Sequence, residues 1–246
     1  MVSRAGSHAG RGFRYQDAVA ACLALQGWAR RSPYGLVTPE GDDDIELHAP
    51  KGRVLTQVKS RRENRGSFLM GEVVAFLTKL WSRTTEQTED SYLLILEREP
   101  AEWTCSQDTA WLSELPAIMR ALPSDIPSDI LARTRIQIMP NPRGAAHQAI
   151  EAQRGCTVLE ADAYFGAVLR RAGNLADDNG MRKSGSFVGL STSDVELELN
   201  RLAPMFTSAR IQAALSRGLC EALDFSTPLE DANFFSGVDV QPGHAP

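Results

Sequence analysis

The sequence predicts an α/β fold in which helices flank a mixed β-sheet and a mainly helical part follows. Three observations lead to this class. Apolar residues recur at helical spacing before residue 30, polar and apolar residues then alternate as in half-buried strands, and residues 92–96 form a continuous apolar run typical of a strand buried on both faces. Beyond that run the spacing is again mostly helical.

The elements can be justified in chain order. Val19, Cys22 and Leu23 lie on one face of the first predicted helix, and Pro33 with Gly35 marks its end. The core elements are a helix at 13–30, strands at 36–38, 44–48 and 54–60, a helix at 69–83 and the buried strand at 91–97. Later helices are expected at 106–122, 145–153, 160–173, 194–203 and 208–222, with short strands at 135–139 and 156–159.

Composition divides the chain into five parts. Small and polar residues at 1–11 predict a flexible N-terminus, and a main domain is expected at 12–175 with its core at 12–100. The Asp-, Asn-, Gly- and Ser-rich stretch 176–190 predicts a linker or loop, and 191–235 a helical C-terminal part. Residues 236–246 are expected to be a tail or a junction to a further domain.

Charge and cysteine usage exclude several classes of protein. The net charge of −5 argues against an abundant non-specific nucleic-acid binder, although a local basic groove remains compatible with it. The four cysteines are scattered, which argues against a structural zinc site. No signal peptide and no apolar run long enough to span a bilayer is found, so a cytoplasmic protein without membrane contact is expected.

An acidic run stands at the start of one predicted strand, and a Gln-x-Lys pattern lies in the next. The run is 42–44, and the pattern consists of Gln57 and Lys59. The turn signal at 49–53 predicts that the two strands form a hairpin. This combination is typical of a metal-dependent phosphodiesterase, because carboxylates bind a hard divalent cation and a lysine stabilises the negative charge that develops on the phosphate.

Strand parity predicts that these groups meet. Gln57 and Lys59 share a face because side chains alternate along a strand, and Asp44, Glu46 and His48 share a face of the preceding strand. Antiparallel pairing then brings Asp44 close to Gln57 and Lys59. His48 lies two pairs further along and is expected to be exposed, outside this site.

This arrangement resembles the PD-(D/E)xK nuclease superfamily, in the Mrr-like variant where Gln replaces the acid of the ExK element. Residues 12–16, Gly-Phe-Arg-Tyr-Gln, look like the start of nuclease domains from bacterial anti-phage effectors. These are effectors of cyclic-nucleotide signalling and nucleases joined to STAND-type or HerA-associated NTPases. The resemblance covers about residues 1–100 and implies a restriction-endonuclease-like core inside a nuclease domain at 12–175.

The resemblance also implies roles for individual residues. Asp44 is the metal-binding aspartate, Gln57 takes the second acidic position, and Lys59 is the catalytic lysine. The implied cofactor is Mg²⁺ or Mn²⁺, which an amide oxygen can also coordinate. Glu40 is a supporting catalytic position and Gln16 a supporting position that we group with nucleic-acid binding.

The residues alone leave several alternatives open. Asp43 is the second candidate for the metal-binding aspartate. Glu40 is either a third carboxylate of the site or an exposed strand end, and Gln16 either reaches the site or faces solvent. The basic run Arg61, Arg62 and Arg65 either contacts DNA phosphates or forms a solvated loop.

The sequence-based hypothesis is a metal-dependent endonuclease that cleaves double-stranded DNA with low sequence specificity and acts as an anti-phage effector. Expected partners are double-stranded DNA, further copies of the chain and a downstream sensor or NTPase domain. One alternative is a catalytically inactive, nuclease-like assembly module. Another is a nuclease acting on RNA or single-stranded DNA, for which Phe68 is the one candidate stacking residue.

Overall fold

The computed structural model describes residues 4–41, 44–50, 52–61, 63–82, 90–103, 105–182 and 186–222. The chain divides into two compact units, Met1–Glu196 and Leu197–Pro246. The first unit contains the whole β-sheet and the helices packed on it. In the second unit, the described residues continue helix α7 (Thr192–Ala222), which begins in the first unit.

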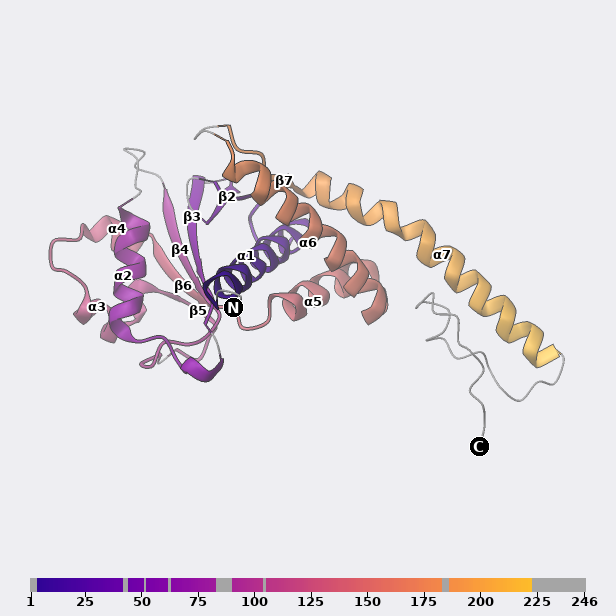
Figure 1. Ribbon diagram of the computed structural model, residues 1–246, viewed down its shortest axis with the longest axis horizontal. Coiled ribbons are helices and arrows are strands. Elements are labelled where there is room, and N and C mark those ends of the chain that lie inside the picture. The colour runs from indigo at the N-terminus through magenta and orange to yellow at the C-terminus, as the bar shows by residue number, and fades with distance from the viewer. Residues whose placement is uncertain are drawn as a thin grey trace. The chain divides into compact units, whose positions relative to one another are not determined.

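A seven-stranded mixed sheet organises the first unit (Figure 1). Its central strands β3, β4 and β6 run parallel, and β2, β1, β7 and β5 pair antiparallel with their neighbours. The spatial order is β5-β6-β4-β3-β2-β1-β7. The strands are β1 (Leu36–Pro39), β2 (Ile45–Ala49), β3 (Gly52–Lys59), β4 (Ser91–Leu96), β5 (Thr109–Trp111), β6 (Thr134–Ile138) and β7 (Leu190–Ser191).

Helices cover both faces of this sheet, which confirms the predicted α/β class (Figure 1). Helices α2, α3 and α4 lie on one side and α1, α5 and α6 on the other. Their bounds are α1 (Arg4–Trp28), α2 (Met70–Trp81), α3 (Pro116–Ala121), α4 (Ser128–Ala132), α5 (Pro142–Arg154) and α6 (Val158–Gly180). Strand β4 is buried along its length between the two layers, as its apolar run predicts.

The β2–β3 hairpin has the turn that the sequence predicts. Ala49 pairs with Gly52 across a two-residue connection. Gly52 has a φ of 128°, a conformation that favours glycine because it has no Cβ. The turn thereby sets the register that places Ile45 opposite Thr56 at the other end of the hairpin.

Helix α1 begins at Arg4 rather than near residue 13. The residues before Phe13 carry no apolar stripe, so periodicity did not reveal them as helical. A helix that has already nucleated extends one residue at a time without needing such a stripe. The backbone of residues 4–11, predicted to be flexible, is therefore helical.

Three later expectations differ from the structure. Residues 106–122 form β5, a 3₁₀ turn and α3 instead of one helix, because Ala110 pairs with Ile136 at the sheet edge. The expected strand at 156–159 is the start of α6, where Thr157 and Glu160 cap each other's backbone N–H groups. The two helices expected at 194–203 and 208–222 are one helix, α7, with Pro204 inside it.

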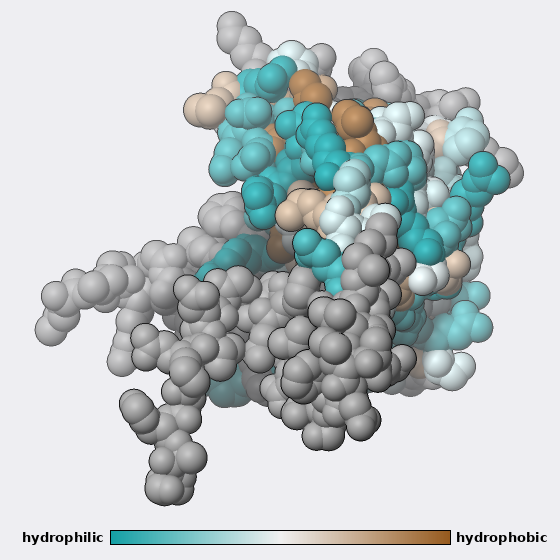
Figure 2. All heavy atoms as spheres, turned by 90° about the vertical axis from the view of Figure 1, so that its right-hand side faces the viewer, coloured by the Kyte–Doolittle hydropathy of each residue, from teal (hydrophilic) through white to brown (hydrophobic). Residues whose placement is uncertain are grey.

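Large apolar side chains that remain exposed are spread over separate elements. On the face of the molecule seen in Figure 2, hydrophilic residues predominate and hydrophobic ones form small groups between them. The most exposed apolar side chains among the described residues are Met181, Val158, Met205, Leu69, Leu159, Leu197, Trp111 and Val188.

None of the helices in the described part of the chain combines the length and apolar character that crossing a membrane requires.

Candidate active site

Asp44 and Lys59 meet at the end of the β2–β3 hairpin that lies away from its turn. The Lys59 ammonium donates to Asp44 Oδ2 at 3.1 Å, and the Val58 N–H donates to the same oxygen at 2.9 Å. Lys59 Nζ also lies 5.7 Å from the centroid of the Phe76 ring on α2. The structure thus brings Asp44 and Lys59 together as strand parity predicts.

Gln57 lies two residues before Lys59 on β3, on the same face of the strand, and is completely buried. Neither its Oε1 nor its Nε2 has a hydrogen-bond partner among the described residues. A buried polar group without a partner costs about 1–3 kcal/mol, so its presence calls for an explanation. A ligand bound next to Asp44 would offer Oε1 a partner.

Gln16 and Glu40 form a second contact with the site, from the α1 side. Gln16 Nε2 donates to Glu40 Oε1 at 2.6 Å and to the Asp44 carbonyl at 3.0 Å. The Glu40 N–H donates to the same carbonyl at 3.0 Å, and Glu40 has a φ of 48°. Gln16 therefore reaches the segment that carries Asp44, and Glu40 is held in the β1–β2 turn beside it.

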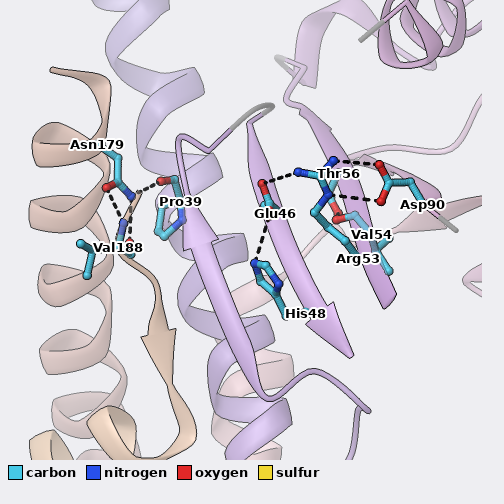
Figure 3. Close-up of polar contacts among 9 residues, drawn as sticks. All are labelled: Pro39, Glu46, His48, Arg53, Val54, Thr56, Asp90, Asn179 and Val188. Atoms are coloured by element: carbon cyan, nitrogen blue, oxygen red, sulfur yellow. Dashed lines mark hydrogen bonds and ion pairs between the residues drawn. The ribbon is translucent and has the colours of Figure 1, made fainter. Parts of the chain in front are cut away.

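Two further hydrogen bonds hold this turn and α1 in place. The Tyr15 hydroxyl on α1 donates to the Met139 carbonyl at 2.7 Å, next to the end of β6. Burial, and secondarily the charge of Glu97, raises the pKa of Tyr15 above its ordinary value. On the other side of the turn, Asn179 donates to the Pro39 carbonyl at 2.7 Å (Figure 3).

Comparison with known proteins bears on the same stretch of chain. Residues 4–94 match the model of the family described as "Cap4, dsDNA endonuclease domain". The matched segment is similar to the Cap4 endonuclease domain. Neither a curated protein nor a solved structure matches the chain.

The Cap4 match confirms the predicted resemblance to a PD-(D/E)xK-type nuclease domain of anti-phage defence. It covers less than half of the 246 residues, yet it includes Gln16, Glu40, Asp44, Gln57 and Lys59. The individual roles of these residues, and the Gln-x-Lys variant, stay predictions.

The basic run after β3 divides into residues with different surroundings. Arg61 is held inside the protein: its guanidinium pairs with Glu72, its Nε donates to the Arg65 carbonyl at 3.2 Å, and it lies 5.0 Å from the Phe68 ring centroid. Arg65 is exposed, and Arg62 lies outside the described residues. Arg61 therefore has an internal structural role, whether or not it also contacts DNA.

Phe68 is buried beneath Arg61 and packs edge-on against Phe76 at 5.9 Å. A base cannot stack on a ring covered in this way. The expectation that Phe68 could form a stacking platform for single strands is therefore wrong. Its apolar environment explains the error, because sequence alone does not distinguish a buried ring from an exposed one.

Glu97 and Glu72 lie next to Lys59 and Arg61, and the sequence did not single them out. Glu97 Oε2 accepts the Arg61 N–H at 2.6 Å, and the Glu97 N–H donates to the Lys59 carbonyl at 3.0 Å. Hydrogen bonds from the Leu69 N–H and from Arg61 lower the pKa of Glu72. Glu97 directly follows β4, which runs parallel to β3. The carboxyl ends of parallel strands meet at one edge of a sheet, so the position of Glu97 in the sequence could have predicted that it lies near Lys59.

A charged cluster occupies the opposite end of the same hairpin (Figure 3). His48 Nε2 lies 3.0 Å from Glu46 Oε1, and Arg53 Nη1 lies 3.5 Å from Glu46 Oε2. Arg53 also binds the buried Asp90 through Nη2 at 2.8 Å and Nε at 3.2 Å. These pairs tie the hairpin to the start of β4, away from Asp44 and Lys59.

The donor set of the candidate site fits a hard divalent cation. Carboxylate and amide oxygens are its preferred ligands, and Gln57 supplies a buried amide oxygen without a partner in the described chain. No group of three or more His, Cys, Asp or Glu side chains suited to a metal occurs within the described ranges. Asp43, the alternative metal ligand, lies outside them, as does Asp42.

Proposed function

We propose that this chain is a Mg²⁺- or Mn²⁺-dependent endonuclease that cleaves double-stranded DNA with low sequence specificity as an anti-phage effector. The observation that carries the proposal is the 3.1 Å pair between Lys59 and Asp44 next to the buried amide of Gln57, which has no hydrogen-bond partner within the described ranges. All three residues lie in the segment that matches a DNA endonuclease family.

In this proposal Asp44 and Gln57 hold the cation, with Asp43 as a further ligand and Glu40 in support. The bound cation would polarise the scissile phosphate and lower the pKa of a coordinated water. Asp44 contributes negative charge, and the neutral Gln57 contributes an oxygen without adding a second charge. A site with fewer charges than a pair of acids would bind the cation less tightly.

Lys59 has the position of the group that stabilises charge in the transition state. Its ammonium is held by Asp44 Oδ2 and by the face of the Phe76 ring, so its direction is set before substrate arrives. A prearranged positive charge next to a phosphate stabilises the additional negative charge that appears as water attacks. Lys59 would also orient that water.

Gln16 acts through the backbone in this scheme. Its amide links Glu40 to the Asp44 carbonyl and thereby sets the position of the Asp44 backbone relative to β3. Its proposed contact with nucleic acid would have to use the same amide, so we regard Gln16 as a positioning residue first. Of the basic run, the exposed Arg65 has the accessibility that a phosphate contact needs.

Double-stranded DNA is proposed as substrate because the matched family is described by that activity. Low sequence specificity is proposed because the sequence shows no recognition helix rich in Arg, Asn and Gln. We further propose a cytoplasmic location, homo-oligomerisation, and activation by a downstream sensor or NTPase that brings sites together.

The proposal is tested by plasmid cleavage at several protein concentrations, with Mg²⁺, with Mn²⁺ and with EDTA. Wild type, Lys59→Ala and the control Lys79→Ala are compared; Lys79 is an exposed lysine near the end of α2. We expect cleavage with either metal, none with EDTA, loss of at least about a hundredfold in Lys59→Ala, and wild-type rates in Lys79→Ala.

Other outcomes would redirect the interpretation. Equal cleavage by Lys59→Ala and wild type would show that the assigned site is wrong. Folded wild-type protein that cleaves neither plasmid, RNA nor single-stranded DNA at any concentration would favour an assembly module. Cleavage of RNA or single strands in preference to plasmid would change the substrate but keep the site.

A further inference from the structure

A pocket lies at the end of the parallel strands opposite to Lys59. It has a volume of about 280 Å³, and its floor includes Val54 and Ser91, which are paired neighbours on β3 and β4. Arg135 on β6 and the segment 33–34 after α1 form its walls. Val54 and Lys59 are separated by five residues of one strand, or roughly 17 Å, so the pocket is distinct from the candidate active site.

The described residues that line this pocket carry positive charge and no negative charge. Two arginines, Arg53 and Arg135, line it, and no Asp or Glu is among its described lining residues. Arg53 is compensated by its contacts with Asp90 and Glu46. For Arg135, no ion pair with a carboxylate is found among the described residues. The pocket therefore presents one guanidinium whose charge is not balanced by an acid.

Arg135 is held in place by uncharged groups. Its Nη2 donates to the Tyr34 hydroxyl at 3.2 Å, and its guanidinium lies 5.0 Å from the Trp111 ring centroid. Its Nε is buried and has no hydrogen-bond partner in the described part of the chain. Because the Tyr34 oxygen accepts from Arg135, the Tyr34 hydroxyl proton is directed toward another acceptor.

Tyr34 is fixed by its backbone as well as by its side chain. A Cβ at Gly27 would lie 2.1 Å from the Tyr34 carbonyl oxygen, so only glycine allows the chain to pass α1 this closely. Tyr34 itself is only 7% exposed. The donor pair formed by Arg135 and Tyr34 is thus preorganised, which lowers the entropic cost of binding a ligand.

We propose that this pocket binds a small molecule with an apolar body and a single carboxylate. Two features support this class. The planar guanidinium and the adjacent hydroxyl suit the two oxygens of a carboxylate, and the single negative charge balances Arg135. Pro33, Ala49, Pro50 and Val54 supply the apolar walls, and a volume near the lower limit for ligand pockets suits a fragment-sized molecule. The inference does not depend on the proposed nuclease activity.

The test titrates the full chain, labelled with ¹⁵N, with benzoate, benzamide and phenyl phosphate. We expect benzoate to shift amide resonances of the pocket residues saturably, with a Kd of about 1 mM or tighter. Benzamide has the same shape without the charge and should bind at least about tenfold more weakly. Phenyl phosphate carries more charge than Arg135 can balance and should also bind more weakly than benzoate.

Variants link the binding to the two donors. Arg135→Met should weaken benzoate binding by at least about tenfold, and Tyr34→Phe, which keeps the ring, by about threefold to tenfold. Arg170→Met, at an exposed arginine on α6, is the matched control and should leave Kd unchanged.

Three results would overturn the proposal. They are the absence of saturable shifts at the pocket, equal binding of benzamide, and benzoate binding that survives both Arg135→Met and Tyr34→Phe. Tighter binding of phenyl phosphate than of benzoate would reject the carboxylate class. Because Tyr34→Phe changes only a hydroxyl, it keeps the test decisive even if Arg135→Met fails to fold.

Discussion

At the scale of single residues, the candidate site depends on a contrast between Lys59 and Gln57. Lys59 lies 3.1 Å from a carboxylate oxygen, whereas neither polar atom of the buried Gln57 side chain has a partner among the residues that the structure describes. A fold does not gain stability from such an amide, because burying it without hydrogen bonds is unfavourable. We propose that the amide oxygen serves a ligand rather than packing.

This contrast leads to a prediction that separates function from stability. Gln57→Leu replaces the amide by an apolar side chain of similar size. We expect at least about a hundredfold loss of Mg²⁺-dependent plasmid cleavage, while the free energy of unfolding in EDTA stays constant or rises by about 1–3 kcal/mol. Urea unfolding and plasmid cleavage measure the two quantities.

Thr56→Val is the matched control for Gln57→Leu. Thr56 is equally buried but points to the other face of β3, and it should retain cleavage. A clear loss of stability in Gln57→Leu would mean that the amide has a structural partner, and normal cleavage by this variant would remove Gln57 from the site.

At the scale of elements, the site is placed by α1 and α6 as much as by the hairpin that carries it. Helix α1 brings Gln16 to the Asp44 carbonyl and Tyr15 to the end of β6. Asn179 on α6 binds the Pro39 carbonyl and both backbone groups of Val188, so it joins β1 to the segment before β7 (Figure 3). These helices hold the turn that precedes Asp44.

Removal of the Asn179 side chain tests this role. Asn179→Ala removes the partner of the buried Pro39 carbonyl and two part-buried bonds to the Val188 backbone, so we expect the free energy of unfolding to fall by about 2–3 kcal/mol. Asn174→Ala, at an exposed position of the same helix, should change it by less than about 0.5 kcal/mol. Urea unfolding of both variants measures these free energies. Equal stability of Asn179→Ala and wild type would show that the three contacts of Asn179 contribute little.

The packing of α1 against α6 also predicts that the stability of the fold depends on pH. Burial, and then the charges of Asp177 and Glu40, raises the pKa of Asp17 to about 6 from its ordinary value of 3.8. The folded state therefore binds this proton more tightly than the unfolded state does. The stabilisation from protonated Asp17 is complete below pH 3.8 and is lost as the pH rises through about 6.

Asp17→Asn should remove the loss of stability that accompanies ionisation of Asp17. We expect the variant to have a higher Tm than wild type at neutral pH, with the difference vanishing near pH 4. Asp178→Asn, at an exposed carboxyl on α6, is the control and should follow wild type at both pH values. Thermal unfolding across this range measures the effect, and a difference independent of pH would contradict the assignment to Asp17.

At the scale of the whole molecule, charge limits how DNA can bind. The chain carries 26 basic and 31 acidic residues, so its overall field opposes a polyanion. Near the candidate site, Arg61 is already paired with Glu72, while Arg65 is exposed. Binding must therefore use a few local contacts rather than a broad basic surface.

This expectation can be measured as a salt dependence. With EDTA present, the logarithm of the association constant for a DNA duplex should fall with the logarithm of salt concentration with a slope of about −2 to −4, equivalent to two to four phosphates. Arg65→Ala should reduce the slope by about one, and Arg170→Ala should not change it. Fluorescence anisotropy provides the measurement; a slope twice as steep, or none, would contradict this picture.

The sequence by itself determined the α/β class, the β2–β3 hairpin and the meeting of Asp44 with Lys59. These follow from local rules, because strand parity and a turn at 49–53 set which side chains share a face. The buried β4 was equally clear from its apolar run.

Only the tertiary structure decided what surrounds that pair. Gln16, Asn179 and Glu97 reach the site region from elements distant in the sequence. Arg61 proved to pair with Glu72, and Phe68 proved to be buried. The pocket around Arg135 likewise gathers residues from the segment after α1, the hairpin, β4 and β6. Such contacts depend on how elements pack across long separations in the chain, and periodicity carries no information about that packing.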